Sequence, residues 1–245
     1  MPSINFALKD CLKNFIGRRN FILVSCFILL SGCAQYQYIS VSSHLDQNDK
    51  KEFIKENDTV KIKYTFAGEN FPINITIYNK LQQPVYIDWQ RSVVIINNVQ
   101  VNDPFYHEGQ SSFIAPLSYV TVSSNSLKDQ FIKPNPGDQK TYVLVSGEGS
   151  RGTKYSYSEQ STPLFFRNVL ALTTNEDLFG PTFFDYSFWV SDIIQTGIGP
   201  SAMSYNPPNQ FYIHKVSGVG KFLGWTAGIS ALIILDALLP DEGNE

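Results

Sequence analysis

The sequence predicts a mainly β protein: an antiparallel β-sandwich with an N-terminal signal helix and a C-terminal apolar helix. Three observations lead to this prediction. Apolar and polar residues alternate with a period of two in several segments, which places one face of a strand in a core and the other in water. Turn-forming Pro, Gly and Asn residues separate these segments at short intervals. Two apolar runs, 21–30 and 222–239, lie outside the alternating region.

Residues 1–32 have the layout of a secretory signal peptide. Basic residues precede the first apolar run, and the small residues Ser31 and Gly32 separate this run from Cys33. Cys26 also ends a tetrapeptide of suitable type. Cleavage there would leave an apolar run of only four residues, whereas a leader needs roughly 7–15. We therefore predict that Cys33 is the first mature residue.

The tetrapeptide Leu30-Ser31-Gly32-Cys33 resembles the lipobox of bacterial lipoproteins. This resemblance implies a thioether-linked diacylglycerol on Cys33, an acylated amino group such as a palmitate amide, and membrane lipid as the first partner. Several acyl chains give stable anchoring, because each buried methylene contributes about 0.8 kcal/mol. Ala34 is not the Asp that resembles an inner-membrane retention signal, so the periplasmic face of the outer membrane is favoured over the inner membrane. The alternative is an uncleaved membrane helix.

The expected mature chain would have 213 residues after loss of 32 from 245, which is enough for a substantial core. Cys11 and Cys26 leave with the leader and Cys33 is lipidated, so no thiol remains for a disulfide or a metal site. The leader also removes four of 19 basic residues and one of 22 acidic residues, leaving a net charge of −6. This balance argues against a nucleic-acid partner, which requires a basic surface.

Residues 33–58 begin, after the cysteine, with AQYQYISVSS and then become mixed in charge. We predict that they form a lipidated tether, either a solvated stalk or a short exposed helix. The β-sandwich domain is predicted over 59–216. Its first strands alternate over 60–66 and 73–77, and Asn97-Asn98 marks a hairpin because Asn tolerates positive φ. Further strands are expected at 85–89, 92–96, 117–123, 139–146, 163–173, 182–190 and 210–215.

Two resemblances concern the sandwich. Trp89 in an early strand resembles the core aromatic of immunoglobulin-like sandwiches, in architecture alone and over roughly 59–145, because the paired cysteines of that family are absent. The stretches PVYIDWQRSVVIINN, TPLFFRNVLALTTNED and FWVSDIIQTGIGP resemble a set of Bacteroidetes lipoproteins with no assigned activity. This second resemblance spans most of the mature chain and brings no catalytic residues with it.

Residues 217–240 contain the second apolar run, and an acidic tail follows over 241–245. Three glycines recur every four residues and share one face of a helix, which lets two helices approach closely in lipid. These glycines are Gly220, Gly224 and Gly228. The apolar run of 18 residues from 222 to 239 is at the lower limit for a membrane span. The segment is expected to form a helix that either enters a membrane and packs against another helix, or docks on the sandwich.

The sequence contains no evident catalytic or metal-binding constellation. His107 lies among carboxylates in 103–108, but no second His or Cys has ligand spacing, so we expect a plain loop. The glycine-rich segment 147–152 lacks the Lys and Ser/Thr of a phosphate loop and is interpreted as a mobile turn. The aromatic residues of 179–189 alternate and are expected mainly in the core. Any of them that are exposed would mark a ligand or partner surface.

These observations predict a lipid-anchored, non-enzymatic cell-envelope protein that acts as a scaffold or binding module for an envelope protein partner. No cofactor and no metal ion are expected. The alternative is an envelope hydrolase or a glycan-binding protein whose carboxylates are gathered by the fold, since general acid–base catalysis needs two carboxylates at a suitable separation. A structure without a cleft that holds paired carboxylates would argue against the hydrolase.

Overall fold

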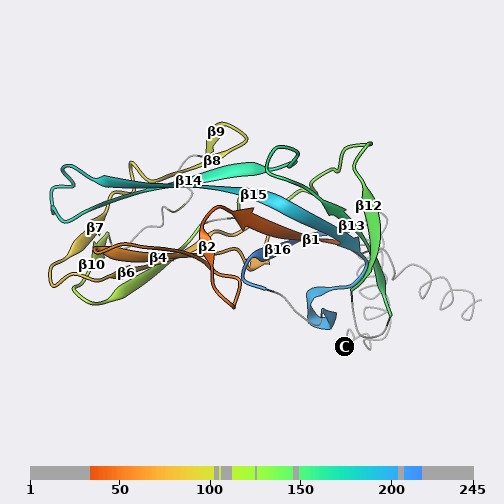
Figure 1. The fold of residues 1–245 in the computed structure, drawn as a ribbon, viewed down its shortest axis with the longest axis horizontal. Coiled ribbons are helices and arrows are strands. Elements are labelled where there is room, and N and C mark those ends of the chain that lie inside the picture. The colour runs from red at the N-terminus through yellow and green to blue at the C-terminus, as the bar shows by residue number, and fades with distance from the viewer. Residues whose placement is uncertain are drawn as a thin grey trace, which may run out of the picture. The chain divides into compact units, whose positions relative to one another are not determined.

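The structure is a computed structural model, and it describes residues 34–101, 105, 112–124, 126–145, 149–203 and 207–216. Within this part of the chain the protein is mainly β, as predicted, and its strands pair almost entirely in antiparallel fashion (Figure 1). The description below concerns the compact unit Gln35–Lys215. Outside the described residues lie the leader with its predicted helix, Cys33, the apolar segment 217–240 and the tail 241–245.

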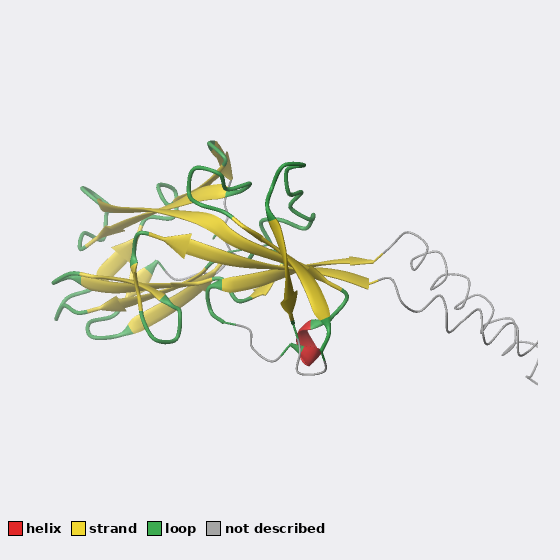
Figure 2. Cartoon of the chain, turned by 45° about the vertical axis from the view of Figure 1, so that its right-hand side comes forward, coloured by secondary structure: helices red, strands yellow, loops and turns green. Residues whose placement is uncertain are grey.

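Two sheets contain the described strands, and Figure 2 shows in red the short helix found among the described residues. The main path of the larger sheet is β10 (Phe113–Ile114), β7 (Val85–Ile87), β14 (Phe165–Thr173), β15 (Thr182–Thr196), β1 (Ala34–Ser43), β16 (Gln210–Val216) and β5 (Gly68–Glu69). Two hairpins extend it: β8 (Val93–Ile96) with β9 (Val99–Val101) on β14, and β12 (Lys140–Leu144) with β13 (Arg151–Ser156) on β15. The smaller sheet is β11 (Tyr119–Ser123), β6 (Asn74–Asn79), β4 (Val60–Thr65), β3 (Phe53–Glu56) and β2 (Asp46–Gln47). A short 3-10 helix, η1, spans Pro200–Ala202.

The strands β4 and β6 follow the alternation predicted from the sequence. In β4 the side chains of Ile62 and Tyr64 are buried, whereas the neighbouring Lys61 and Lys63 are more exposed. In β6 the side chains of Ile75, Ile77 and Asn79 are buried. Ile62 pairs with Ile77 and Tyr64 with Ile75, so the buried faces of the two strands coincide. Both strand predictions for this region are confirmed.

The hairpin predicted at Asn97-Asn98 is also confirmed. The two residues have φ values of 48° and 66°, which suit a two-residue hairpin turn and which Asn tolerates. The turn joins β8 to β9, where Ile96 pairs with Val99. The Oδ1 atom of Asn97 accepts a hydrogen bond from the Phe165 N–H at 3.0 Å, so the turn is tied to β14.

The prediction of a tether over 33–58 is wrong for the described residues of that segment. β1 lies between β15 and β16 in the larger sheet, and Tyr38 and Ile39 are at most 1% exposed. Gln37 is fully buried; its amide donates to the Ile132 carbonyl at 2.6 Å and its oxygen accepts the Ile132 N–H at 2.8 Å. The strand is rich in Gln, Tyr and Ser, but polar side chains such as those of Gln37, Tyr38 and Ser43 form hydrogen bonds within the fold. The strands β2 and β3 then join the smaller sheet.

The larger sheet contains strand residues that the sequence did not predict, at the end of β15 and in β13. β15 continues to Thr196, well past its predicted end, because β1 and β13 both pair with its second half. β13 replaces part of the turn predicted over 147–152. A Cβ on Gly152 would lie 3.0 Å from side-chain atoms of both Ile194 and Val145, so this glycine permits close packing in a strand. The strands predicted at 117–123, 139–146, 163–173 and 210–215 are found with ends that differ by at most two residues.

An aromatic core joins the two sheets. Phe66, which follows β4, packs against Phe166 of β14 and Phe188 of β15, with ring centroids 5.5 and 5.2 Å apart. Phe71 extends the cluster to Phe211 of β16 at 4.7 Å. All five rings have an exposed fraction of 0%. Such ring pairs contribute about 0.5–1.5 kcal/mol each beyond the burial of their surface.

Trp89 lies in the turn after β7, not in a strand as predicted. The turn forms because Asp88 Oδ1 accepts the Arg91 N–H at 3.1 Å and the Ser92 hydroxyl donates to the Asp88 carbonyl at 2.7 Å. The indole is partly buried, with its ring centroid 6.2 Å from that of Phe105. The position of Trp89 therefore does not support an immunoglobulin-like sandwich, and that type of sandwich stays a prediction.

Candidate functional site

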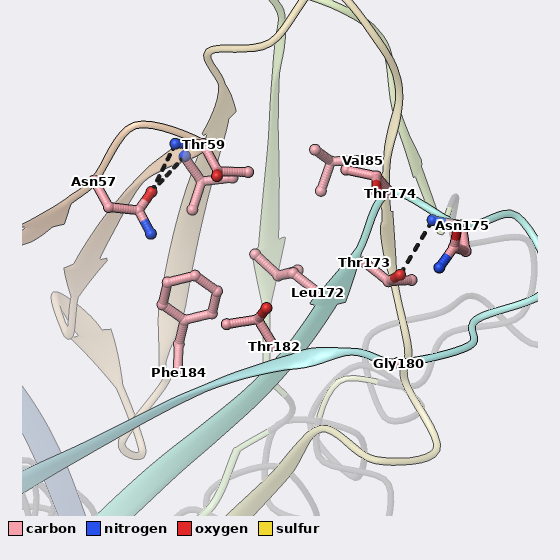
Figure 3. A pocket seen from close by; sticks show the side chains of 11 residues that line it. Asn57, Thr59, Val85, Leu172, Thr173, Thr174, Asn175, Gly180, Thr182 and Phe184 are labelled. Atoms are coloured by element: carbon pink, nitrogen blue, oxygen red, sulfur yellow. Dashed lines mark hydrogen bonds between the residues drawn. The ribbon is translucent and has the colours of Figure 1, made fainter.

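A pocket of about 300 Å³ lies at one end of the sheets, between the β14–β15 hairpin and the β3–β4 turn (Figure 3). Four threonines, two asparagines, one glycine and four apolar residues line it, and none of these eleven residues carries a charge. Its volume is at the lower end of the range of about 300–1,000 Å³ that small-molecule pockets occupy. We call this end of the sheets the pocket end.

The apolar part of the lining comes from both sheets. Val60 belongs to β4, Val85 to β7, Leu172 to β14 and Phe184 to β15. Each is at most 7% exposed. Figure 3 shows Leu172 and Phe184 between the turn that carries Asn57 and the hairpin end that carries Thr173. The pocket therefore has an apolar floor fixed by the packing of the core.

Hydrogen bonds hold the β14–β15 hairpin in one conformation beside this floor. The Thr173 hydroxyl donates to the Phe179 carbonyl at 3.0 Å and accepts the Asn175 N–H at 3.1 Å. The Asn175 side-chain amide donates to the same Phe179 carbonyl at 2.9 Å. Gly180, with φ of 60°, then returns the chain to β15 in a conformation that L side chains rarely adopt. One wall of the pocket is thus built from a bonded turn.

The opposite wall is the turn at Asn57. Its Oδ1 atom accepts the N–H groups of Thr59 and Val60 at 2.9 and 2.8 Å. Lys80 braces this turn, because its Nζ donates to the Asn57 carbonyl at 2.8 Å and to Glu56 at 2.9 Å. Hydrogen bonds from Lys80 and then Lys61 lower the pKa of Glu56, so its carboxylate is paired outside the pocket.

Several polar groups of the lining have no hydrogen-bond partner among the described residues. They are the hydroxyls of Thr59, Thr174 and Thr182 and the Nδ2 amide of Asn57. Hydroxyl groups both donate and accept, and an amide nitrogen donates. The pocket therefore offers uncharged hydrogen-bonding groups around an apolar floor, which suits a neutral ligand that itself carries hydroxyl or amide groups.

Two aromatic side chains beside the pocket are exposed. Phe179 and Phe183 have exposed fractions of 79% and 54%. Phe184 and Phe188 of the same predicted aromatic group are buried, as expected for the inward face of β15. The alternation thus separates the group into a core face and an exposed face, and exposed aromatic rings are typical of interaction surfaces.

The opposite end of the larger sheet is where β1 begins and β16 ends. Tyr36 stacks on His214 with ring centroids 4.6 Å apart, and the Val41 N–H donates to the Asn209 carbonyl at 2.8 Å. Both pairs match an antiparallel alignment of β1 with β16. The chain that follows Cys33 and the chain that leads to the second apolar run therefore enter and leave the sheet at the same place. We call it the terminal end.

The strand β15 connects the two ends (Figure 1). Its first residue, Thr182, lines the pocket, and its last residue, Thr196, pairs with Tyr36 at the terminal end. Fourteen residue steps separate the two, which corresponds to about 46 Å at 3.3 Å per residue. The pocket therefore lies far from the point at which the chain enters the sheet.

The predicted site residues are only partly described. Outside the described residues are Cys33, Gly220, Gly224, Gly228 and His107. His44 pairs with Glu159 at 3.0 Å on the surface, and His214 stacks on Tyr36. In the described part of the chain, no three His, Cys, Asp or Glu side chains gather closely enough to hold a metal ion. No helix found there has the length and apolarity to cross a membrane.

Comparisons of the chain with protein-family models, with curated proteins and with solved structures find no match in any of the three. The sequence signal for the pocket is weak, because Thr and Asn at turns are common for local reasons. Only the folded structure, in which 57–60 and 172–184 line the same pocket, shows that these residues form one site.

Proposed function

We propose that this chain is a lipoprotein of the bacterial cell envelope, held in the membrane by a diacylated Cys33 and acting as a non-enzymatic binding module. The expected location is the periplasmic face of the outer membrane. One observation carries the proposal. The strand β15 has the pocket at its first residue, Thr182, and pairs with the start of β1 through its last residue, Thr196. A protein anchored at Cys33 would present its pocket about 46 Å from the terminal end, measured along the strand.

The same arrangement favours a membrane contact for the second apolar run over a helix docked on the sandwich. Only six residue steps separate Val216, the last residue of β16, from Phe222 at the start of that run. β16 ends beside the start of β1, so the run leaves the sheet where the lipid is attached. In this proposal Gly220, Gly224 and Gly228 form the face that packs against another helix in the membrane.

The pocket supports a glycan as the envelope ligand. Its free hydroxyl and amide groups match sugar hydroxyls, and the floor formed by Leu172 and Phe184 suits the C–H face of a sugar ring. A charged ligand would lose its hydration without gaining an opposite charge from the lining. The lining also contains no Asp or Glu, so it offers no carboxylate pair for hydrolysis of a glycosidic bond. This favours binding over the hydrolase.

The anchor is tested by expressing the intact chain and a Cys33→Ala variant in a Gram-negative host and measuring the N-terminal peptide by mass spectrometry. We expect a cleaved, diacylated Cys33 in the intact chain and loss of that modification in the variant. An uncleaved and unlipidated N-terminus in the intact chain would overturn the proposal, since the leader would then be a membrane helix.

The pocket is tested with the lipidated chain in vesicles and a series of neutral oligosaccharides of glucose and N-acetylglucosamine. Thr182→Val keeps the shape of the side chain and removes one hydroxyl, so we expect affinity to fall about 3- to 10-fold, the effect of one neutral hydrogen bond. Thr141→Val, in exposed β12 at the other end of the sheet, is the matched control and should bind as the parent does. Equal affinities for both variants, or no binding of any oligosaccharide, would remove the glycan proposal.

A further inference from the structure

We propose that β12 is a membrane-contacting strand that lays the side chains of Tyr142 and Leu144 in the interface of the bilayer to which Cys33 is attached. The proposal rests on the lipid anchor proposed above, but concerns residues that the anchor does not require. This second point of contact with the membrane would determine the orientation of the sandwich relative to the bilayer.

The strand β12 exposes an unusual amount of apolar surface. Tyr142 and Leu144 have exposed fractions of 74% and 73%, among the largest of the described hydrophobic side chains. They are two positions apart and therefore share one face of the strand, together with exposed Lys140. Among the described strands β12 pairs with β13 alone, so it is also an edge of the larger sheet. Proteins normally shorten, charge or cover such edges.

The position of β12 in the sheet points to what covers it. Leu144 pairs with Arg151 of β13, and the Arg151 carbonyl accepts a hydrogen bond from the Thr196 hydroxyl at 3.5 Å. Thr196 in turn pairs with Tyr36 of β1. These four residues form one row across the terminal end of the sheet. Tyr36 follows Cys33 by three residues, which is about 10 Å of extended chain, so a lipidated cysteine would bring the bilayer surface close to this row.

The chemistry of the strip formed by Lys140, Tyr142 and Leu144 fits that surface. Tyrosine is enriched at the membrane–water interface, where its ring is buried and its hydroxyl stays hydrated. A leucine beside it adds apolar contact with the acyl boundary. Lys140 and Arg151 are exposed, have no ion-pair partner among the described residues and can meet lipid phosphates. Phe179 and Phe183 at the pocket end are also exposed, but the hairpin turn beside them carries the acidic residues Glu176 and Asp177 and no basic residue.

The test uses the lipidated full chain reconstituted in phosphatidylethanolamine–phosphatidylglycerol vesicles. The mature sequence has no cysteine after Cys33, so a single introduced thiol can be labelled cleanly. Leu144→Cys and Tyr142→Cys each receive an environment-sensitive fluorophore, and Phe179→Cys at the pocket end is the matched control. Quenching by doxyl groups on the lipid reports contact with the bilayer, and quenching by iodide reports contact with water.

We expect doxyl lipid to quench the labels at 142 and 144 at least several-fold more than the label at 179, and iodide to do the reverse. Equal quenching by iodide at all three positions, with the chain still in the vesicles, would overturn the contact and leave the anchor intact. Labels at 142 and 144 that are shielded from both quenchers would overturn it in favour of strand pairing between two copies. A chain that is not retained in the vesicles would overturn the anchor and this contact together.

Discussion

Two buried asparagines show how a single residue can stabilise or destabilise this fold, depending on its partners. Asn79 and Asn168 both have exposed fractions of 0%. The Asn79 amide donates to three carbonyls, those of Gln83, Ile114 and Ala115, at 2.8 to 3.1 Å. It therefore ties the end of β6 to the following turn and to the end of β10. Neither amide atom of Asn168 in β14 has a partner among the described residues. Burial of an unpaired amide costs free energy, whereas a paired one contributes to stability.

This contrast predicts opposite effects of the same substitution. Leucine has the branching of asparagine without its polar atoms, so Asn168→Leu should raise the free energy of unfolding by about 1–2 kcal/mol, the usual cost of an unsatisfied buried group. Asn79→Leu leaves three carbonyls without their donor and should lower it by about 2–4 kcal/mol. Urea denaturation of both variants measures the difference. A lower midpoint for Asn168→Leu would mean that internal water satisfies this amide in solution.

The strands differ in how readily the sequence predicts them. β4, β6 and the Asn97-Asn98 hairpin follow from local pattern, because one face of each strand is buried and the turn requires positive φ. β1 does not. It is inserted between two strands of the larger sheet, and its Gln37 is satisfied by Ile132, which lies 95 residues away. No local pattern records such a partner, so a polar composition suggested a tether.

The sequence did not predict the pocket, because its residues are also brought together by the fold and not by a local pattern. Its polar residues come from a turn at 57–59 and a hairpin at 173–182, each of which has an adequate local explanation. The aromatic group at 179–189 did give a signal, because its alternation separates buried Phe184 from exposed Phe183. The sequence could therefore predict which face of β15 is exposed. Only the pairing of β14 with β7 and β15 shows that the pocket lies beside that strand.

At the scale of the whole molecule, the direction of the strands relates the start of β1 and the end of β16 to the pocket. Tyr36 and His214 stack at the terminal end, and the pocket lies at the other end of β15. The first residues of β1 and the last residues of β16 therefore lie together at the end of the larger sheet that is opposite the pocket. If a lipid on Cys33 and the apolar run after Val216 enter one membrane, the sandwich is held at two neighbouring points while its pocket stays free to meet a ligand.

This arrangement predicts that the apolar run binds membranes without the lipid. The chain is exported with a leader cut by the ordinary signal peptidase and with Cys33→Ala, either complete or ending at residue 216. We expect the complete form to sediment with membranes and resist carbonate extraction, because the run of 18 mostly apolar residues, with Asp236 as its one charge, is just long enough to cross the hydrocarbon core. The short form should be released. Equal resistance of both forms to trypsin within the sandwich serves as the folding control. Release of the complete form would instead show that the run docks on the sandwich, and the four-residue spacing of Gly220, Gly224 and Gly228 would then serve packing against protein.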